Sequence, residues 1–497
     1  MLGRSGGVTD VPNPSGGDAL LEPGRNCWRI ERAGQAALIV DAADYYRLAR
    51  EAMLKARSQI FLIGWDLDTR ISLVSGDPGD GAPAKLGALV TWLSKHRPEL
   101  DIYILAWDQA ALSVPARGTT LFRLLRWASR KRIHVKFDHS HPLDGSHHQK
   151  TVVIDDTLAF CGGIDMTGAR WDTREHRDRD EGRRMPFTRR RYSPWHDAIM
   201  AVDGKVAQAL GELARFRWKL ATGHGLSPPA RRGEPWPAAL KPVFHDVEVA
   251  IARTRAKEKE IEEVREIEAL FVDMIASAKR YVYVETQYFA SRVVAEAMAR
   301  RLDEPDCPEF VFVNPRTAYG WLDGAVMTPA RYQLVEALEA RRYGDRFRIY
   351  TPVTAGGDDI YVHAKIMIVD GVLLRVGSAN LNNRSMGLDS ECDLLVDGRG
   401  RDDVQAEIAT ILCDLLAEHL GLECEAVERC FAETGSLMAC VERLRGGGGR
   451  TLVPLEPEAP AIGKALADSE LLDPEGPHGL FEPRARPGLL SRLRPRR

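Results

Sequence analysis

The sequence has no long hydrophobic run. None of its apolar stretches approaches the roughly 20 residues that a helix needs to cross a bilayer. The first 24 residues, rich in Gly, Pro and Ser, also lack the apolar core of a cleavable signal peptide. A membrane-spanning protein is therefore excluded, and the default location is the cytoplasm. Export by a route that needs no signal peptide remains the alternative.

A strong charge of one sign and paired cysteines are lacking too. The 68 basic and 71 acidic residues leave a net charge of −3, which argues against a nucleic-acid partner. The eight cysteines are scattered without any C-x2-C pair, so we expect free thiols rather than a zinc site. We predict no cofactor and no metal. The apolar fraction of 44% is that of an ordinary globular protein.

What the sequence does contain is a motif that occurs twice. Each copy reads H-x-K-x4-D and is followed, after the same six-residue gap, by a glycine pair or Gly-Ser. One copy could arise by chance, but two with identical inner spacing indicate a duplication. The residues of the two copies are His148, Lys150 and Asp155, and His363, Lys365 and Asp370.

The second copy predicts a phosphate site. If residues 361–369 form one strand, its period of two places His363 and Lys365 on the same face. Asp370 and Gly371 then make a hairpin turn, and the loop after the return strand brings N–H and hydroxyl groups to the same place. The predicted phosphate-binding residues of the two copies are Gly377, Ser378, Asn380 and Gly163. Where the second copy has Asn380, the first has Asp165, which cannot donate to phosphate when ionised.

With this duplicated motif the chain resembles the phospholipase D superfamily. The resemblance covers roughly residues 24–420, because it extends to GWDLDTR at 64–70, PWHD at 194–197, ETQYF at 285–289 and NLNNRSMGLDSE at 380–391. It is closest to the phospholipase D enzymes proper. The resemblance implies that His148 is the nucleophile, that His363 is the general acid, and that Asp155 and Asp370 belong to the signature.

The order of predicted elements alternates as α/β in both halves of the chain. We expect two similar lobes, each a mixed sheet flanked by helices, related by a pseudo-two-fold axis. The predicted parts are a disordered N-terminus (1–24), a first lobe (25–222), a linker (223–246), a second lobe (247–420) and a helical, flexible and basic tail (421–497). We expect a monomer.

A metal-free enzyme that cleaves a phosphodiester needs cations around the oxygens, a nucleophile and an acid. The two imidazoles can act from opposite sides of the phosphorus, through a phosphohistidine. Each ring then needs a partner on its other nitrogen. Asp197 and Glu391 both stand six residues before an Asp-Gly turn, so we predict that Asp197 orients His148 and that Glu391 orients His363.

Other residues have weaker signals. Glu285 and Gln287 are predicted to line the substrate cleft or to form a buried polar pair, and Trp65 and Asp66 to lie near the cleft. His139, His141, His147 and His148 do not have the spacing of a standard metal site. The arginine-rich stretch 170–193 is either a solvated loop or a cationic lip that meets lipid phosphates.

The function predicted from these residues is that of a phospholipase D. Such an enzyme hydrolyses phosphatidylcholine-type lipids at a membrane surface to phosphatidate and the head-group alcohol, with transphosphatidylation when an alcohol replaces water. A cardiolipin synthase-type phosphatidyl transferase and a nuclease of the same superfamily are the alternatives. A lipid-binding module without activity is disfavoured, because both motifs are intact.

Overall fold

The structure is a computed structural model that describes residues 20–107, 126–127, 129–142, 145–258, 260–317 and 321–455, with only the backbone for 321–326. Most of the predicted disordered N-terminus, the predicted helix at 121–131 except residues 126–127 and 129–131, and the basic end of the chain lie outside these ranges. Within them, no helix is long and apolar enough to cross a membrane.

Both halves of the chain contain helices and strands, and the fold is α/β as predicted. In the first half they are β1 (Arg29–Val40), α1 (Ala42–Lys55), β2 (Gln59–Gly64), α2 (Leu86–His96), β3 (Asp101–Trp107), β4 (Ile133–Asp138), β5 (Thr151–Ile154), β6 (Leu158–Gly162), β7 (Trp195–His196), β8 (Ala198–Asp203) and α5 (Gly204–Thr222). In the second half they are β9 (Phe244–Arg255), β10 (Val264–Arg265), α6 (Glu266–Ser277), β11 (Tyr281–Glu285), α7 (Arg292–Arg301), β12 (Glu309–Val313), α8 (Trp321–Glu339), the 3-10 turn η2 (Gly344–Arg346), β13 (Phe347–Val353), β14 (Tyr361–Val362), β15 (Ile366–Val369), β16 (Leu373–Gly377), α9 (Asn383–Gly387), β17 (Glu391–Asp397), α10 (Asp402–Leu420), α11 (Cys424–Thr434), α12 (Leu437–Leu444) and β18 (Thr451–Pro454).

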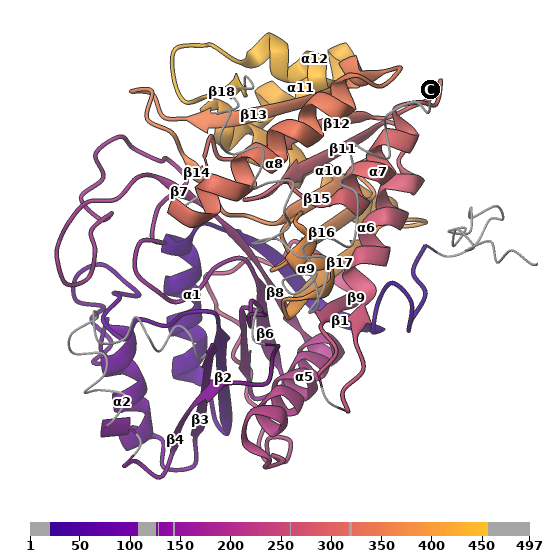
Figure 1. Cartoon of the computed structure of the whole chain (residues 1–497). Coiled ribbons are helices and arrows are strands. Elements are labelled where there is room, and N and C mark those ends of the chain that lie inside the picture. Colours follow the sequence, from indigo (N-terminus) through magenta and orange to yellow (C-terminus); the bar gives the residue numbers. More distant parts are fainter. Residues whose placement is uncertain are drawn as a thin grey trace, which may run out of the picture.

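Sixteen of the strands form one continuous mixed sheet. Its order, with β10 beside β9, is β18-β13-β12-β11-β15-β16-β17-β9-β1-β8-β6-β5-β2-β3-β4. Outward from the β9–β1 pair, each strand of the first half has its counterpart at the same place in the second half, so the chain has the expected internal two-fold symmetry. The outermost strands β4 and β18 lie at opposite ends of the molecule (Figure 1).

Two long strands join the halves of the chain. Strands β1 and β9 each have 12 residues and pair antiparallel, from Arg29 with Ile251 to Ala36 with Phe244. The two predicted lobes therefore share one sheet.

Helices cover both faces of this sheet. Alternate residues of β8 face opposite sides: Met200 and Val202 lie in the core under α5 and α10, and Ile199 and Ala201 lie in the core under α1 and α2. A third core joins α6, α7 and α8 to the second half of the sheet. This period-two division of buried residues is what fixes the strand register.

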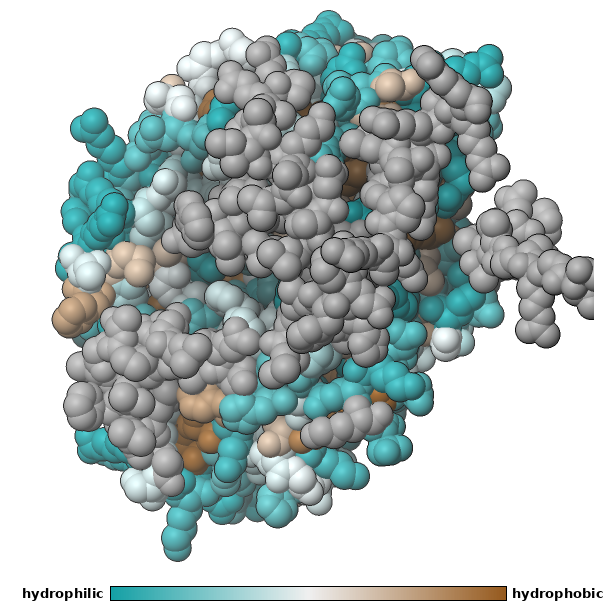
Figure 2. Space-filling view, viewed as in Figure 1, coloured by the Kyte–Doolittle hydropathy of each residue, from teal (hydrophilic) through white to brown (hydrophobic). Residues whose placement is uncertain are grey.

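The segment after residue 420 was predicted as a helical, flexible and basic tail, and its described part, up to residue 455, contains two helices and a strand. Helices α11 and α12 pack on the shared core through Val427, Cys430, Leu437 and Val441, and β18 pairs with β13. The outer surface is mostly hydrophilic where Figure 2 is coloured, and the large hydrophobic side chains exposed in the described part are Phe187, Phe216 and Leu422.

Candidate active site

The two motif histidines lie just before strands β5 and β15, which occupy equivalent places on either side of the β9–β1 pair. The prediction of one strand through 361–369 was wrong, because the backbone leaves the strand at residues 363–365. There the His363 N–H donates to the carbonyl of His196, 2.7 Å away, in the other half of the chain. The His148 N–H likewise donates to the carbonyl of Ser390 at 3.0 Å. Each motif is thus bonded to the opposite half.

The carboxylates that hold the imidazoles are exchanged between the halves. His148 Nδ1 lies 3.0 Å from Glu391 Oε1, and His363 Nδ1 lies 2.6 Å from Asp197 Oδ2. The predicted pairing of each histidine with the acid of its own half was therefore wrong. It assumed that equivalent positions pair within a repeat, whereas the segments cross at the axis, where β14 and β7 pair in parallel.

Because Nδ1 of each ring faces a carboxylate, Nε2 is the nitrogen that can attack phosphorus or carry a proton to it. The side chain of His148 is 16% exposed and that of His363 is 5% exposed. The ring of Trp195 lies 5.2 Å from that of His363, between centroids, and forms one wall beside it.

Each motif lysine is held by a hydrogen bond to the backbone carbonyl of the histidine two residues before it. Lys150 Nζ donates to the carbonyl of His148 at 2.8 Å, and Lys365 Nζ donates to the carbonyl of His363. Both ammonium groups are buried. Lys150 Nζ also lies 3.4 Å from Asp165 Oδ2, so the residue that replaces asparagine in the first copy balances this charge.

The electrostatics show that the two motifs converge. Burial lowers the pKa of His363 well below its usual value, and the charges of Lys365, Arg170, Lys150 and His148 lower it further. Burial and the neighbouring Lys150 lower the pKa of Lys365 to about 7, although Asp197 opposes this. An anion bound here would relieve this excess of positive charge.

The two carboxylates respond differently to their surroundings. Burial would raise the pKa of Glu391, but His148, Lys150 and Ser378 outweigh it and lower that pKa to about 2. Burial raises the pKa of Asp197, and Lys365 offsets this only in part. Glu391 is therefore the more firmly ionised of the two orienting acids.

Three of the four predicted phosphate-binding residues lie directly against buried carboxylates. Ser378 Oγ donates to Glu391 Oε2 at 2.5 Å. A Cβ on Gly163 would lie 2.1 Å from Asp197 Oδ1, and a Cβ on Gly377 would lie 1.9 Å from Asp393 Oδ1, so both positions need glycine for close packing. Asn380 is buried, and its Oδ1 accepts no hydrogen bond within the described residues. Its amide NH2 is the group that could donate to a phosphate, so it stays a candidate.

Asp155 and Asp370 brace the sheet and do not reach the histidines. The Asp155 carboxylate accepts the N–H groups of Arg57, Ser58 and Gln59 at 2.7 to 2.8 Å. Asp370 accepts those of residues 279–281 at 2.7 to 2.9 Å. Both belong to the signature that predicts the catalytic residues, and these contacts indicate a supporting role at the far ends of β5 and β15.

Glu285 and Gln287, predicted to line the cleft or to form a buried polar pair, are both buried. Glu285 is fully buried and bonded to His196, His419 and Tyr283, so it forms a polar cluster below the site. Gln287 donates to the hydroxyls of Tyr288 and Tyr361 at 2.8 and 3.0 Å.

Asp66 and Trp65, both predicted to lie near the cleft, differ in their exposure to solvent. Asp66 is buried and accepts from Thr167 Oγ1 at 2.8 Å. Trp65 is half-buried and stacks on Trp107, with ring centroids 5.6 Å apart. Of the two, Trp65 remains open to solvent.

The arginine-rich stretch 170–193 is only partly free to meet a ligand. Arg174, Arg183, Arg184 and Arg191 form ion pairs with acids of the protein. Arg170 stands over the ring of Trp195, 4.2 Å from its centroid, next to His363. No sequence pattern predicted this contact, because nothing distinguished Arg170 from the other arginines of the run.

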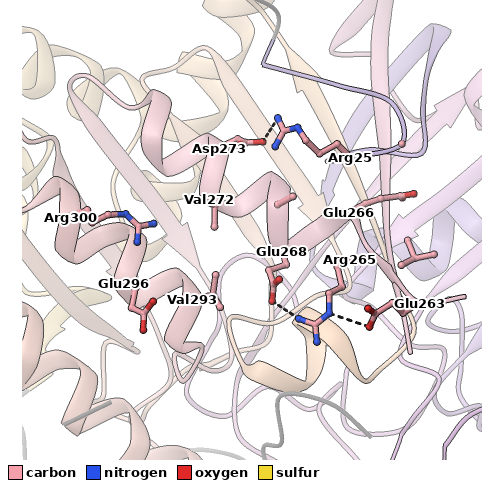
Figure 3. Close-up of a pocket in the computed structure, with 13 residues that line it drawn as sticks. Arg25, Glu263, Arg265, Glu266, Glu268, Val272, Asp273, Val293, Glu296 and Arg300 are labelled. Carbon is pink, nitrogen blue, oxygen red and sulfur yellow. Dashed lines mark hydrogen bonds and ion pairs between the residues drawn. The ribbon is translucent and has the colours of Figure 1, made fainter. Parts of the chain in front are cut away.

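A separate pocket of about 620 Å³ lies beside helices α6 and α7 (Figure 3). Its charged residues pair with one another: Arg265 contacts Glu263 and Glu268, and Arg25 contacts Asp273. No residue of either H-x-K motif lines it. The motif histidines, and not this pocket, therefore define the candidate active site.

Both halves of the chain match known protein families. Residues 52–229 match the family model described as Phospholipase D, and residues 271–412 match the one described as Cardiolipin synthase, PLD-like domain. The chain is 23% identical over 464 residues to Phospholipase D A of Dictyostelium discoideum, covering 78% of this chain and 35% of that protein. It is 23% identical over 511 residues to Phospholipase D alpha 4 of Arabidopsis thaliana, covering 80% of this chain and 66% of that one.

The fold has a counterpart among solved structures. The phosphatidylserine synthase of Haemophilus influenzae Rd KW20 superposes with a TM-score of 0.52 and 14% sequence identity, over 75% of this chain and 84% of that one. The duplicated sheet, the crosswise histidine pairs and the two family matches, one in each half, point to the same conclusion. The chain belongs to the phospholipase D superfamily and carries two phospholipase D-like domains.

Proposed function

We propose that this protein is a phospholipase D that hydrolyses glycerophospholipids of the phosphatidylcholine type to phosphatidate and the head-group alcohol. The observation that carries the proposal is the pair of histidines, each held at Nδ1 by a carboxylate of the opposite half, with two buried lysines beside them. Two imidazoles with free Nε2 atoms suit a double displacement at one phosphorus.

In the first step His148 Nε2 attacks the phosphorus, and the bond from phosphorus to the head-group oxygen breaks. His363 Nε2 gives its proton to that oxygen, so the alcohol leaves uncharged. His363 then takes a proton from water, which attacks the phosphohistidine and releases phosphatidate. The assignment of His148 as nucleophile rests on the resemblance to the superfamily.

The attack also needs positive charge around the phosphate oxygens. Lys150 and Lys365 would hold the non-bridging oxygens, and the amide of Asn380 would donate to them. The negative phosphodiester offsets the positive charges that lower the pKa of His363. His363 thereby gains its proton as the substrate binds, which is when the acid is needed.

The arginine-rich stretch 170–193 supports a substrate at a membrane surface. The side chain of Phe187 is 66% exposed, and Arg189 and Arg190 beside it are exposed as well. An apolar ring flanked by cations suits the head-group region of an anionic membrane. The same stretch begins at Arg170, beside Trp195 and His363, so it would join the membrane contact to the site.

The test is turnover of phosphatidylcholine vesicles by the purified protein with and without ethanol. We expect phosphatidate alone in water and phosphatidylethanol when ethanol competes for the phosphohistidine. His148→Ala and His363→Ala should each abolish turnover, by several orders of magnitude. The matched control His245→Ala alters an exposed histidine of β9 and should leave turnover unchanged.

The same assay separates the other candidates. The match of residues 271–412 to the cardiolipin synthase model favours phosphatidyl transfer between lipids as the second function. With phosphatidylglycerol as acceptor, that function would yield cardiolipin faster than phosphatidate. Cleavage of DNA without any lipid turnover would overturn both.

A further inference from the structure

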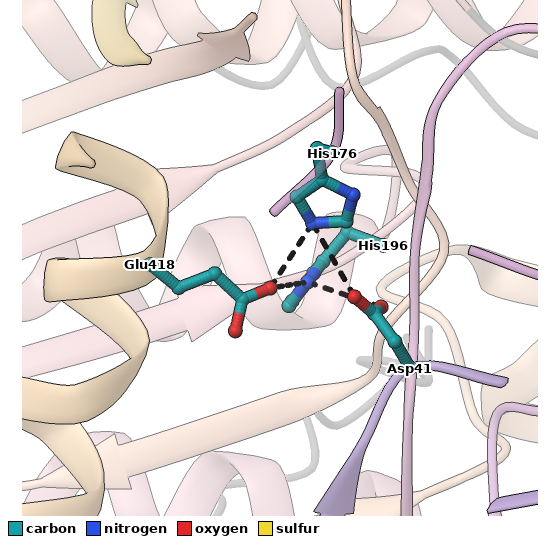
Figure 4. A group of neighbouring side chains, drawn as sticks. All are labelled: Asp41, His176, His196 and Glu418. Carbon is teal, nitrogen blue, oxygen red and sulfur yellow. Dashed lines mark hydrogen bonds and ion pairs between the residues drawn. The ribbon is translucent and has the colours of Figure 1, made fainter. Parts of the chain in front are cut away.

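Two buried histidines and two buried carboxylates meet behind the active site (Figure 4). Asp41 follows strand β1, His176 lies in the stretch 170–193, His196 ends β7, and Glu418 comes from helix α10. None of the four is more than 5% exposed. Four segments, three from the first half and one from the second, thus direct ligand-type atoms to one point.

The distances between these atoms resemble the edges of a metal coordination sphere. Glu418 Oε1 lies 3.0 Å from His176 Nε2 and 2.8 Å from His196 Nδ1. The Asp41 oxygens lie 3.4 and 3.6 Å from the same two nitrogens. A tetrahedral zinc ion with bonds of about 2.0 Å separates its ligands by about 3.3 Å. These four contacts are close to that spacing, and one ligand atom from each residue lies within 4.8 Å of the other three, so the four side chains could close around an ion.

The outer nitrogen of each histidine already has the partner that metal ligands use. His176 Nδ1 lies 3.0 Å from Asp172 Oδ2, and His196 Nε2 lies 2.7 Å from Glu285 Oε2. A carboxylate on the second nitrogen fixes the tautomer and turns the lone pair of the first nitrogen toward the metal. Both imidazoles are therefore preset to act as ligands.

One ligand atom has no hydrogen bond. Asp41 is 1% exposed, and its Oδ2 accepts none from any residue that the structure describes, although it is 3.4 Å from His176 Nε2. A buried carboxylate oxygen without a donor is costly unless a cation meets it. This atom points into the cluster, where the cation would sit (Figure 4).

The charges of the cluster point the same way. The cluster has four buried carboxylates. Glu418 contacts the guanidinium group of Arg174, which it shares with Asp414, and Asp172 contacts that of Arg183. Asp41 and Glu285 contact no guanidinium group in the described part of the chain, so their two negative charges are left over. One divalent cation balances them and leaves both imidazoles neutral, as ligands must be.

We propose that Asp41, His176, His196 and Glu418 bind one divalent cation of the zinc type. Zinc accepts the imidazole nitrogens and carboxylate oxygens of this set, and four buried protein ligands without an open position suit a structural rather than a catalytic ion. The ion ties helix α10 to β1 and β7, and it holds His196 next to Asp197, which in turn orients His363. It takes no part in the attack on phosphorus, and the proposal does not depend on the identity of the lipid.

The experiment is a measurement of metal content. The full-length protein is expressed in zinc-supplemented medium, desalted and analysed by atomic emission. We expect about one zinc per chain for the wild type and less than about a tenth for His176→Gln and Asp41→Asn. The control Asp156→Asn alters a buried aspartate that pairs with Arg215 outside the cluster, and it should keep its zinc.

A second measurement covers variants that fail to fold. The wild type is unfolded in chelator and refolded with Co²⁺, and we expect the visible absorption of a tetrahedral cobalt centre. A wild type that carries no zinc as expressed, and neither Zn²⁺ nor Co²⁺ after refolding to its native circular dichroism, overturns the proposal. The cluster is then a hydrogen-bonded network of protonated histidines. Zinc that persists in both cluster variants overturns it as well.

Discussion

The imidazole of His148 is held by the carboxylate of Glu391, which lies 243 positions later in the chain. The equivalent contact of the other repeat joins His363 to Asp197. Neither half of the protein therefore contains both a catalytic histidine and the carboxylate that orients it. The active site exists only where the two repeats meet.

Removal of either orienting charge should nearly abolish turnover while the fold remains. We expect Glu391→Gln and Asp197→Asn to lower kcat by about 10³- to 10⁴-fold, because the histidine then takes the wrong tautomer. The check is steady-state hydrolysis of a phosphodiester. Glu391→Gln combined with His148→Ala should cost little more than His148→Ala alone, because the two act as a unit.

Glu442→Gln is the matched control for these variants, since it removes a carboxylate charge that contacts Arg445 and Tyr350 rather than a histidine. It should leave kcat unchanged. Full activity in Glu391→Gln would show that the crosswise contact has no part in catalysis.

The rate should fall on the alkaline side of neutrality. The pKa of Lys365 is lowered to about 7, so its ammonium is present below that pH and is lost above it. Phosphate binding needs the ammonium, and kcat/KM should therefore decline above about pH 7. Lys365→Arg should move this decline to higher pH, whatever its effect on the maximal rate. A wild-type profile that stays flat to alkaline pH would contradict the role of Lys365.

Asp155 should prove to be a stability residue. Its carboxylate accepts three backbone N–H groups, and hydrogen bonds to charged groups are worth about 1.5 to 3 kcal/mol each. We expect Asp155→Ala to lower the free energy of unfolding by about 3 kcal/mol or more, measured by urea denaturation. The kcat of the folded protein should stay near that of the wild type.

Asp77→Ala, an exposed change in the 75–84 loop, is the control and should alter neither quantity much. A loss of kcat as large as that of His148→Ala, with unchanged unfolding, would return Asp155 to the catalytic residues.

Phe187 should matter only when the substrate is in a membrane. We expect Phe187→Ser to lower kcat/KM on anionic vesicles by about tenfold or more, because burial of a phenyl ring contributes roughly 1.5 to 3 kcal/mol. Turnover of a short, soluble phosphodiester should not change. Phe216→Ser removes another exposed ring, on helix α5, and should affect neither substrate. Equal losses on both substrates would place Phe187 in the site rather than at the membrane.

The sequence alone was sufficient for the features that local spacing encodes. Two copies of H-x-K-x4-D identify the histidines, and a two-residue interval is what lets each lysine donate to the carbonyl of its own histidine. Alternating apolar residues give the strands near the motifs, and the internal repeat gives the two-fold arrangement. These features depend on neighbours within a few positions, which a linear pattern preserves.

Only the tertiary structure decided which partners cross between the repeats. Asp197 and Glu391 stand at equivalent positions, so the sequence could not tell that each serves the histidine of the opposite half. Gly163 and Ser378 looked like phosphate ligands, yet they make room for or bond to those acids. The buried group of Asp41, His176, His196 and Glu418 draws on four distant segments. Such contacts form because the two half-sheets join along β1 and β9, a packing event that leaves no local periodic signal.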